Sequence, residues 1–105
     1  MKRVIDGLVY DTARATAICP LPSPTQDRSN FGWHDTKLYR TAKGRFFIAG
    51  KGGPRSMWRR AIDTNFWSSG EGLRAASAEE ARGFMESAGC VPDEFIAVGL
   101  STQDA

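Results

Sequence analysis

The side chains that carry most enzyme and metal chemistry are scarce in this chain. There is one histidine, His34, and there are two cysteines, Cys19 and Cys90, which lie 71 positions apart. No metal-ligand spacing connects them, and the acidic residues form no calcium-loop pattern. Asp35 follows His34, but no recognisable motif places a serine or a cysteine near this pair. We therefore expect no enzymatic activity, no metal ion and no cofactor, with a small hydrolase built on His34 or Cys19 as the alternative.

Long apolar segments are also missing. No apolar run approaches the roughly 20 residues that a membrane-spanning helix needs. The segment Met1–Asp6 carries charge without an apolar stretch behind it, which predicts that no signal peptide is present. A chain of 105 residues that is 41% hydrophobic and 25% charged is typical of a single small domain, 1–105. We expect a cytoplasmic protein whose two cysteines are reduced thiols.

Acidic residues are absent from the stretch Thr36–Ile62, where the basic residues concentrate. This stretch contains eight lysines and arginines, interleaved with aromatic side chains. Residues 1–60 carry twelve Lys/Arg and four Asp/Glu, a net charge of +8, whereas residues 61–105 carry two and eight, a net charge of −6. Such a division can steer a charged partner and set its orientation. The alternative is that the two halves fold against each other and neutralise locally.

The alternation of side chains in this stretch predicts a β-hairpin over residues 36–49. The sequence Thr41-Ala42-Lys43-Gly44 is typical of a tight turn with Gly44 in the left-handed region. That turn pairs Tyr39 with Phe47 on one face of the hairpin, and Leu38 with Ile48 on the other. Both faces are then partly apolar, so that one meets the core and the other needs a helix, a partner chain or a ligand.

A glycine loop and a short amphipathic helix are expected after the hairpin. Pro54 suits a first helical position, and the helical period would place Met57, Trp58, Ala61 and Ile62 on one side, with the arginines on the other. The loop 50–56 precedes this helix but does not have the spacing of a phosphate-binding P-loop. We interpret it as a turn.

The most clearly predicted element is a helix over residues 78–88. Ser77 and Glu80 form a capping box at its start, and Gly89 follows its end. The other expected features are short strands at 2–5, 8–10, 16–19 and 72–75, an irregular loop at 20–32, a Ser/Gly-rich loop at 64–72 with Phe66 and Trp67 under the sheet edge, a helical turn or edge strand at 93–98, and a flexible tail at 101–105. Together they predict an α+β fold, a small antiparallel sheet with one main C-terminal helix packed on a face and a second short helix.

The basic and aromatic cluster is the best candidate for a binding surface. Nucleic-acid sites combine phosphate-pairing Lys and Arg with planar side chains on which bases stack. The candidate partner-binding residues are Lys37, Tyr39, Arg40, Lys43, Arg45, Phe47, Lys51, Arg55, Arg59 and Arg60. The alternative interpretation is that the aromatic side chains fill the core and the charges form a solvated face.

Several short motifs, spread over most of the chain from Tyr10 to Ala88, form a larger pattern. They are Tyr10-Asp11-Thr12, Leu38-Tyr39-Arg40-Thr41, Lys43-Gly44-Arg45-Phe46-Phe47, Gly50 with Gly52-Gly53-Pro54, Trp67-Ser68-Ser69-Gly70-Glu71 and Glu79-Glu80-Ala81. This pattern resembles a family of small uncharacterised proteins carried by bacterial mobile elements and prophages. Lys51 departs from it, since that position is usually acidic in the family, and Trp58 with the arginine pair after it is particular to this chain. None of the motifs has a known chemical role.

The resemblance implies a function by analogy, because small proteins of such elements include anti-CRISPR inhibitors, which bind effector complexes and usually have no active site. The leading hypothesis is a non-enzymatic binding protein that inhibits a host defence complex, such as a CRISPR effector, by occupying a protein or nucleic-acid surface. The alternative is a small module that binds RNA or DNA through the face 37–60. The two partly apolar hairpin faces also leave a homodimer open.

Overall fold

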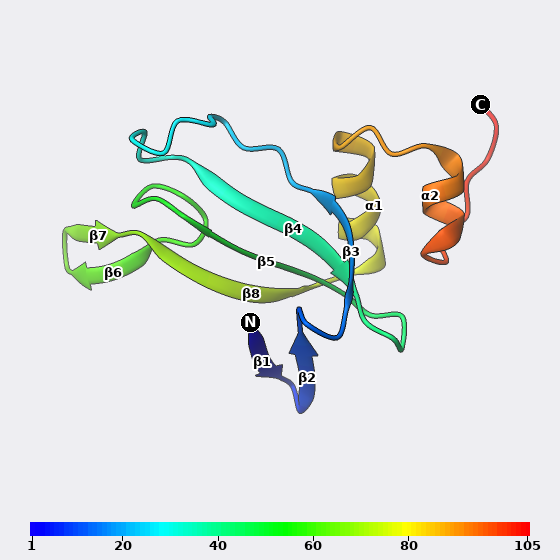
Figure 1. Cartoon of the computed structure of the whole chain (residues 1–105), viewed down its shortest axis with the longest axis horizontal. Helices are drawn as coiled ribbons and strands as arrows, with labels where there is room; N and C mark the ends of the chain where they lie inside the picture. Colours follow the sequence, from blue (N-terminus) through cyan, green and yellow to red (C-terminus); the bar gives the residue numbers. More distant parts are fainter.

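The computed structural model describes all residues, 1–105, and has an α+β fold, as predicted (Figure 1). Eight strands come first and two helices follow, and the molecule measures 47 × 33 × 21 Å. Two small hairpins flank one larger sheet. No helix has both the length and the apolar character needed to cross a membrane.

The larger sheet is antiparallel and has the strand order β3-β4-β5-β8. The strands are β3 (Thr16–Pro20), β4 (His34–Arg40), β5 (Phe46–Gly52) and β8 (Gly70–Ala76). The predicted register is confirmed, because Leu38 lies opposite Ile48 and Tyr39 opposite Phe47. The turn between β4 and β5 closes as expected, with Gly44 at a φ of +86°.

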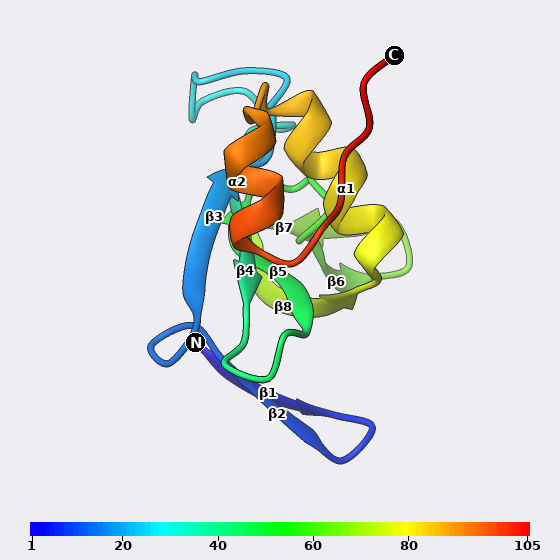
Figure 2. The same ribbon diagram turned by 90° about the vertical axis from the view of Figure 1, so that its right-hand side faces the viewer.

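One face of this sheet is covered by the two helices (Figure 2). Helix α1 (Ala78–Ser87) has the predicted capping box at Ser77 and Glu80, and Gly89 follows its end at a positive φ of +76°. Leu38 and Ile48 pack against Met85 of this helix in a shared core. The short helix α2 (Pro92–Ala97) closes the same core and is the second helix of the fold. For this segment the sequence had predicted either a helical turn or an edge strand.

The opposite face is covered by the N-terminal hairpin of β1 (Lys2–Ile5) and β2 (Leu8–Asp11). Tyr10 from β2 packs edge-on against Phe47, with ring centroids 5.4 Å apart and an angle of 67°. Arg3 donates a hydrogen bond to the Leu73 carbonyl at 2.7 Å, which ties the hairpin to β8. The chain itself therefore packs side chains against both faces of the β4–β5 hairpin.

The prediction of a helix over residues 54–62 is wrong. The segment forms two tight turns and then strand β6 (Arg60–Asp63), which pairs with β7 (Phe66–Ser68). Two side chains favour the turns over a helix. The Ser56 hydroxyl donates to the Gly53 carbonyl at 2.7 Å and accepts from the Trp58 amide at 3.2 Å, and the Trp58 indole donates to Thr36 Oγ1 at 2.8 Å. These contacts hold the backbone in turns, because a hydroxyl bonded to nearby backbone groups competes with helical hydrogen bonding.

The expected position of Phe66 and Trp67 under the sheet edge is also wrong. Both lie on the β6–β7 hairpin, which projects from the end of the sheet farthest from the helices (Figure 1). Phe66 is 66% exposed and Trp67 is 46% exposed. The loop 20–32 is irregular, as predicted, apart from the end of β3 at Pro20, and it runs from the end of β3 along the sheet to this same end (Figure 1).

Candidate nucleic-acid interface

The aromatic side chains of the predicted surface belong to the core. Phe47 has no exposed surface, and Tyr39 stacks on it with ring centroids 5.0 Å apart and an angle of 12°. The prediction that Phe47 binds a partner is wrong, because no ligand can reach this buried side chain. Tyr39 is half-buried and serves mainly to pack the sheet.

Two of the predicted basic residues lie on the open part of the sheet, beyond the N-terminal hairpin. Lys37 and Lys51 are both exposed there. In the sheet register Lys51 lies between Asp35 on β4 and Glu71 on β8. Opposite charges on neighbouring strands attract across the sheet. The Asp35 and Glu71 carboxylates on the neighbouring strands therefore partly offset the charge of Lys51, which forms no ion pair.

The remaining basic residues divide between the two ends of strand β4. Arg40, Lys43 and Arg45 lie at or beside the β4–β5 turn, whereas the arginines of residues 55–60 lie beyond Gly52, at the other end. Strand β4 has seven residues, and at about 3.3 Å per residue it spans about 23 Å. The six remaining basic residues of the predicted surface thus form two separate groups at opposite ends of β4.

The second group belongs to a cluster that we call the arginine–aromatic end, at the tip of the molecule opposite the helices (Figure 1). Its members come from the loop 28–33, the turns 53–59 and the hairpin β6–β7. They are Arg28, Phe31, Trp33, Arg55, Arg59, Arg60, Phe66 and Trp67.

Backbone hydrogen bonds hold the two loops of this end together. The Phe31 carbonyl accepts from the Arg55 amide at 2.8 Å, and the Trp33 carbonyl accepts from the Gly53 amide at 2.9 Å. A Cβ at Gly53 would overlap the Phe31 carbonyl, so the close approach requires glycine. The turn predicted at the glycine loop thus brings the arginines beside a loop distant in sequence.

Two arginines of this end lie over tryptophan rings. The Arg59 guanidinium carbon is 4.4 Å from the ring centroid of Trp67, and that of Arg28 is 4.8 Å from that of Trp33. Such contacts are cation–π interactions, which hold the planar guanidinium and the ring in fixed positions. Neither arginine pairs with a carboxylate, because the two ion pairs of the protein are Lys2–Asp11 and Arg74–Glu80.

A hollow of about 600 Å³ opens beside these residues. Its lining includes Trp33, Trp58, Arg59 and Arg60, together with residues of β5 and β8, among them Lys51 and Glu71. Phe31, whose carbonyl accepts from the Arg55 amide, is 59% exposed. The arrangement combines planar side chains, on which a flat ligand can stack, with unpaired positive charge beside them.

Sequence reasoning missed the aromatic half of this cluster. Phe31 lies in the loop 20–32, Trp33 directly follows that loop, and Phe66 and Trp67 were placed under the sheet edge. The available signal was that Arg28 and Phe31 share an irregular loop, since long loops in small domains are often functional. Nothing local in the sequence indicates that this loop and the β6–β7 hairpin meet.

The residues of the hydrolase alternative have structural contacts. His34 Nδ1 is 2.9 Å from Thr36 Oγ1, which also accepts the Trp58 indole N–H. Cys19 is buried in the helical-face core next to Cys90. Burial and the neighbouring Cys90 thiol raise the pKa of Cys19 to about 11, so the nucleophilic thiolate is scarce at neutral pH. The hydrolase alternative gains no support from this geometry.

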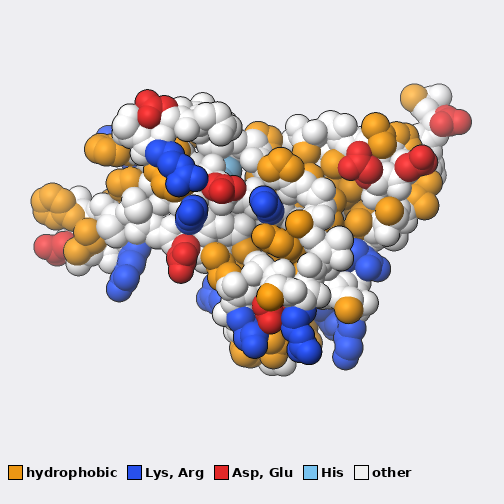
Figure 3. Space-filling model, viewed as in Figure 1, with side chains coloured by type: hydrophobic (Ala, Val, Ile, Leu, Met, Phe, Trp, Pro, Cys, Tyr) orange, Lys and Arg blue, Asp and Glu red, His pale blue; other side chains and the backbone are white.

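The charge division of the sequence is visible on part of the surface. Basic side chains gather on the lobe formed by the N-terminal hairpin, and acidic side chains mark the end that carries α1 and α2, while further acidic side chains lie at the β6–β7 end and over the middle of this face (Figure 3). The two ion pairs, at 3.8 and 4.0 Å, are both partly exposed and leave most charges unpaired. The charges of the two halves are therefore not neutralised by pairing.

A scan against protein-family models and searches of curated proteins and of solved structures found no match to this chain. The resemblance to small mobile-element proteins therefore stays a prediction.

Proposed function

We propose that this protein is a non-enzymatic binding protein of the cytoplasm that binds single-stranded nucleic acid through its arginine–aromatic end. The observation that carries the proposal is the pairing of exposed arginines with exposed aromatic rings, Arg59 over Trp67 above all. Bases stack on aromatic rings with about 1–3 kcal/mol per base, and arginines attract the phosphates between them. Single strands are favoured over duplexes because only unpaired bases offer their faces for stacking.

The shape of this end supports the same ligand. Trp33 lines the hollow, Phe31 lies two residues before it on the same loop, and Trp67 comes from the β6–β7 hairpin, where it contacts Arg59 of the lining. Rings from two segments can therefore take bases in succession. No helix of the fold lies there to enter a major groove. Recognition through stacking and phosphate contacts is tolerant of sequence. We expect little preference among bases.

The first test is a titration of a labelled oligothymidine, and of a duplex of the same length, at about 50 and 200 mM salt. We expect micromolar binding of the single strand that weakens steeply with salt, and much weaker binding of the duplex. Fluorescence anisotropy measures both. The absence of single-strand binding at low salt would reject the proposal.

Inhibition of a host defence complex is the second candidate function. The feature that favours it is the charge division, because a protein with one basic and one acidic region can enter a nucleic-acid channel in one orientation. In this version the arginine–aromatic end contacts a guide or target strand inside a CRISPR effector or a similar complex. A plasmid interference assay across CRISPR subtypes tests it, and uninhibited interference with no co-purifying effector would reject it.

A further inference from the structure

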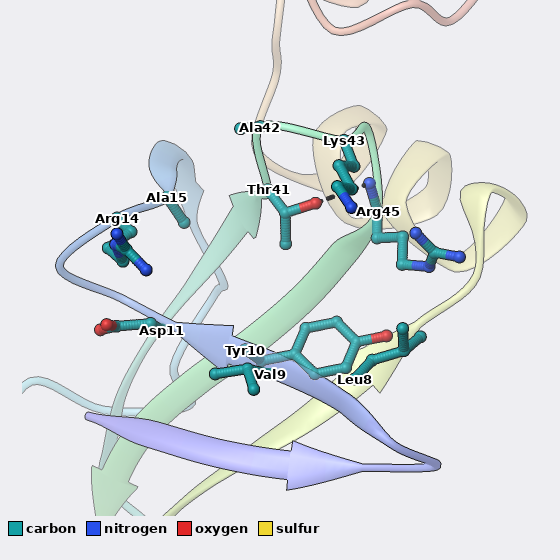
Figure 4. A pocket seen from close by; sticks show the side chains of 10 residues that line it. All are labelled: Leu8, Val9, Tyr10, Asp11, Arg14, Ala15, Thr41, Ala42, Lys43 and Arg45. Atoms are coloured by element: carbon teal, nitrogen blue, oxygen red, sulfur yellow. Dashed lines mark hydrogen bonds between the residues drawn. The ribbon is translucent and has the colours of Figure 1, made fainter.

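A second hollow, of about 530 Å³, lies between the N-terminal hairpin and the β4–β5 turn (Figure 4). This volume falls in the range of roughly 300–1,000 Å³ that is typical of small-molecule sites. The site is at the opposite end of β4 from the arginine–aromatic end. We call it the hairpin pocket; its lining residues used below are Leu8, Val9, Tyr10, Arg14, Lys43 and Arg45.

Three cationic side chains surround the hairpin pocket, and none of them has an anionic partner. Arg14, Lys43 and Arg45 form no ion pair and donate no side-chain hydrogen bond. The one acidic residue of the lining, Asp11, is already engaged, since its carboxylate accepts from the Ala13 amide at 3.0 Å and pairs with Lys2 at 3.8 Å. The hollow therefore carries uncompensated positive charge from two different segments.

Hydrogen bonds order the two backbone segments that carry these side chains. At the β4–β5 turn, Thr41 Oγ1 accepts from the Arg45 amide at 3.0 Å, and the Thr41 carbonyl accepts from the Gly44 amide at 2.9 Å. Across the hollow, the Arg14 amide donates to the Asp11 carbonyl at 3.2 Å. Both segments are short hydrogen-bonded turns rather than free loops.

Tyr10 adds a hydrogen-bond donor to the hollow. Its ring is packed on Phe47, its residue is only 5% exposed, and its hydroxyl forms no hydrogen bond within the protein. Because the residue lines the hollow, this hydroxyl can donate to a molecule bound there. In Figure 4 the Tyr10 ring lies between Arg14 on one side and Arg45 on the other, with Lys43 above it. A ligand in this position can supply the missing acceptor.

We propose that the hairpin pocket binds a small phosphorylated organic molecule of the size of a mononucleotide. Three unpaired cations match the charge of about −2 on a phosphate monoester at neutral pH. The aliphatic side chains of Leu8 and Val9, together with the Tyr10 ring, suit the apolar body of such a molecule. This site is separate from the arginine–aromatic end, and it does not depend on the function proposed for that end.

The test is a titration of the full chain, labelled with ¹⁵N, with AMP, adenosine and inorganic phosphate, followed by NMR. We expect saturable shifts at the hairpin pocket with AMP, weaker shifts at the same residues with phosphate, and none there with adenosine. The double variant K43A/R45A should bind AMP at least about tenfold more weakly. Tyr10→Phe, which keeps the ring, should weaken binding several-fold, and Arg59→Ala should leave it unchanged.

Several results would overturn the inference. They are the absence of saturable shifts up to about 10 mM AMP, equal binding of adenosine and AMP, unchanged affinity in the folded K43A/R45A variant, and shifts confined to Trp33 and Trp67. A 5′-phosphorylated oligonucleotide that binds the pocket far more tightly than AMP would assign the site to a strand end instead of a free small molecule. Loss of single-strand binding in Arg59→Ala with retained AMP binding would separate the two sites.

Discussion

At the level of single side chains, a small number of long-range hydrogen bonds shape the candidate interface. The hydroxyl of Thr36 is buried, accepts the Trp58 indole N–H at 2.8 Å and lies 2.9 Å from His34 Nδ1. Trp58 in turn lies over Gly72, where the ring leaves no room for a Cβ. These contacts fix the turns that carry Arg55 and Arg59.

We predict that Thr36→Val destabilises the fold by about 1–3 kcal/mol. Valine keeps the shape of threonine but leaves the Trp58 N–H and His34 Nδ1 without their buried partner. Urea unfolding measures the change. Thr64→Val, at an exposed position, is the matched control and should alter the free energy of unfolding by less than about 0.5 kcal/mol. Equal effects of the two variants would show that the buried hydroxyl is unimportant.

We also predict that Cys19 reacts slowly with alkylating reagents until the pH is well above 9. Burial and the neighbouring Cys90 raise the pKa of Cys19 from 9.0 to about 11. Because the folded state holds the proton more tightly than the unfolded state, this group stabilises the fold below pH 9 and loses that contribution as the pH rises toward 11. Mass spectrometry of native protein treated with iodoacetamide measures the rate, and a rate that levels off below pH 9 would contradict the assignment.

At the level of secondary-structure elements, each end of the sheet is completed by a small local unit. The helices close one end, and α1 begins at a capping box in which Ser77 accepts from the Glu80 amide and Glu80 accepts from the Ser77 amide, both at 3.0 Å. The β6–β7 hairpin completes the other end and carries the exposed aromatic residues. Structural and binding roles are thereby divided between different elements.

We predict that Ser77→Ala lowers the stability of the protein by about 0.5–2 kcal/mol and leaves nucleic-acid binding unchanged. The hydrogen bond from the Ser77 amide lowers the pKa of Glu80. The ionised Glu80 carboxylate therefore stabilises the folded state above its ordinary pKa of 4.5, and this stabilisation disappears as the pH falls through the lowered pKa. Thermal unfolding at neutral pH measures the effect of the variant. Ser101→Ala, in the C-terminal tail, is the control, and an equal shift in both variants would argue against the cap.

For the molecule as a whole, the sequence predicted the structure correctly where residues close together in the chain determine it. The β4–β5 register follows from the alternation of residues 36–49 and from the positive φ available to Gly44, and the capping box defines the start of α1. These signals are local, and the tertiary structure agrees with them.

The candidate site was less predictable because it depends on contacts between distant segments. The helical period of Met57 and Trp58 was overridden by the bond from Trp58 to Thr36, 22 positions away. The sequence found Arg55, Arg59 and Arg60 but placed them with the basic residues of the β4–β5 turn, which lie at the other end of the sheet. Which aromatic residues accompany the arginines is decided only when the chain has folded.

The measurement that tests the account most directly compares single-strand binding by two double variants. R59A/W67A removes the stacked pair of the arginine–aromatic end, whereas R74A/I96A removes an arginine and an exposed apolar side chain elsewhere on the surface. We predict that R59A/W67A, once shown to be folded by circular dichroism, binds labelled oligothymidine at least about tenfold more weakly than the original chain. R74A/I96A should bind as the original chain does. Equal affinities for the two folded variants would contradict the proposed role of this end.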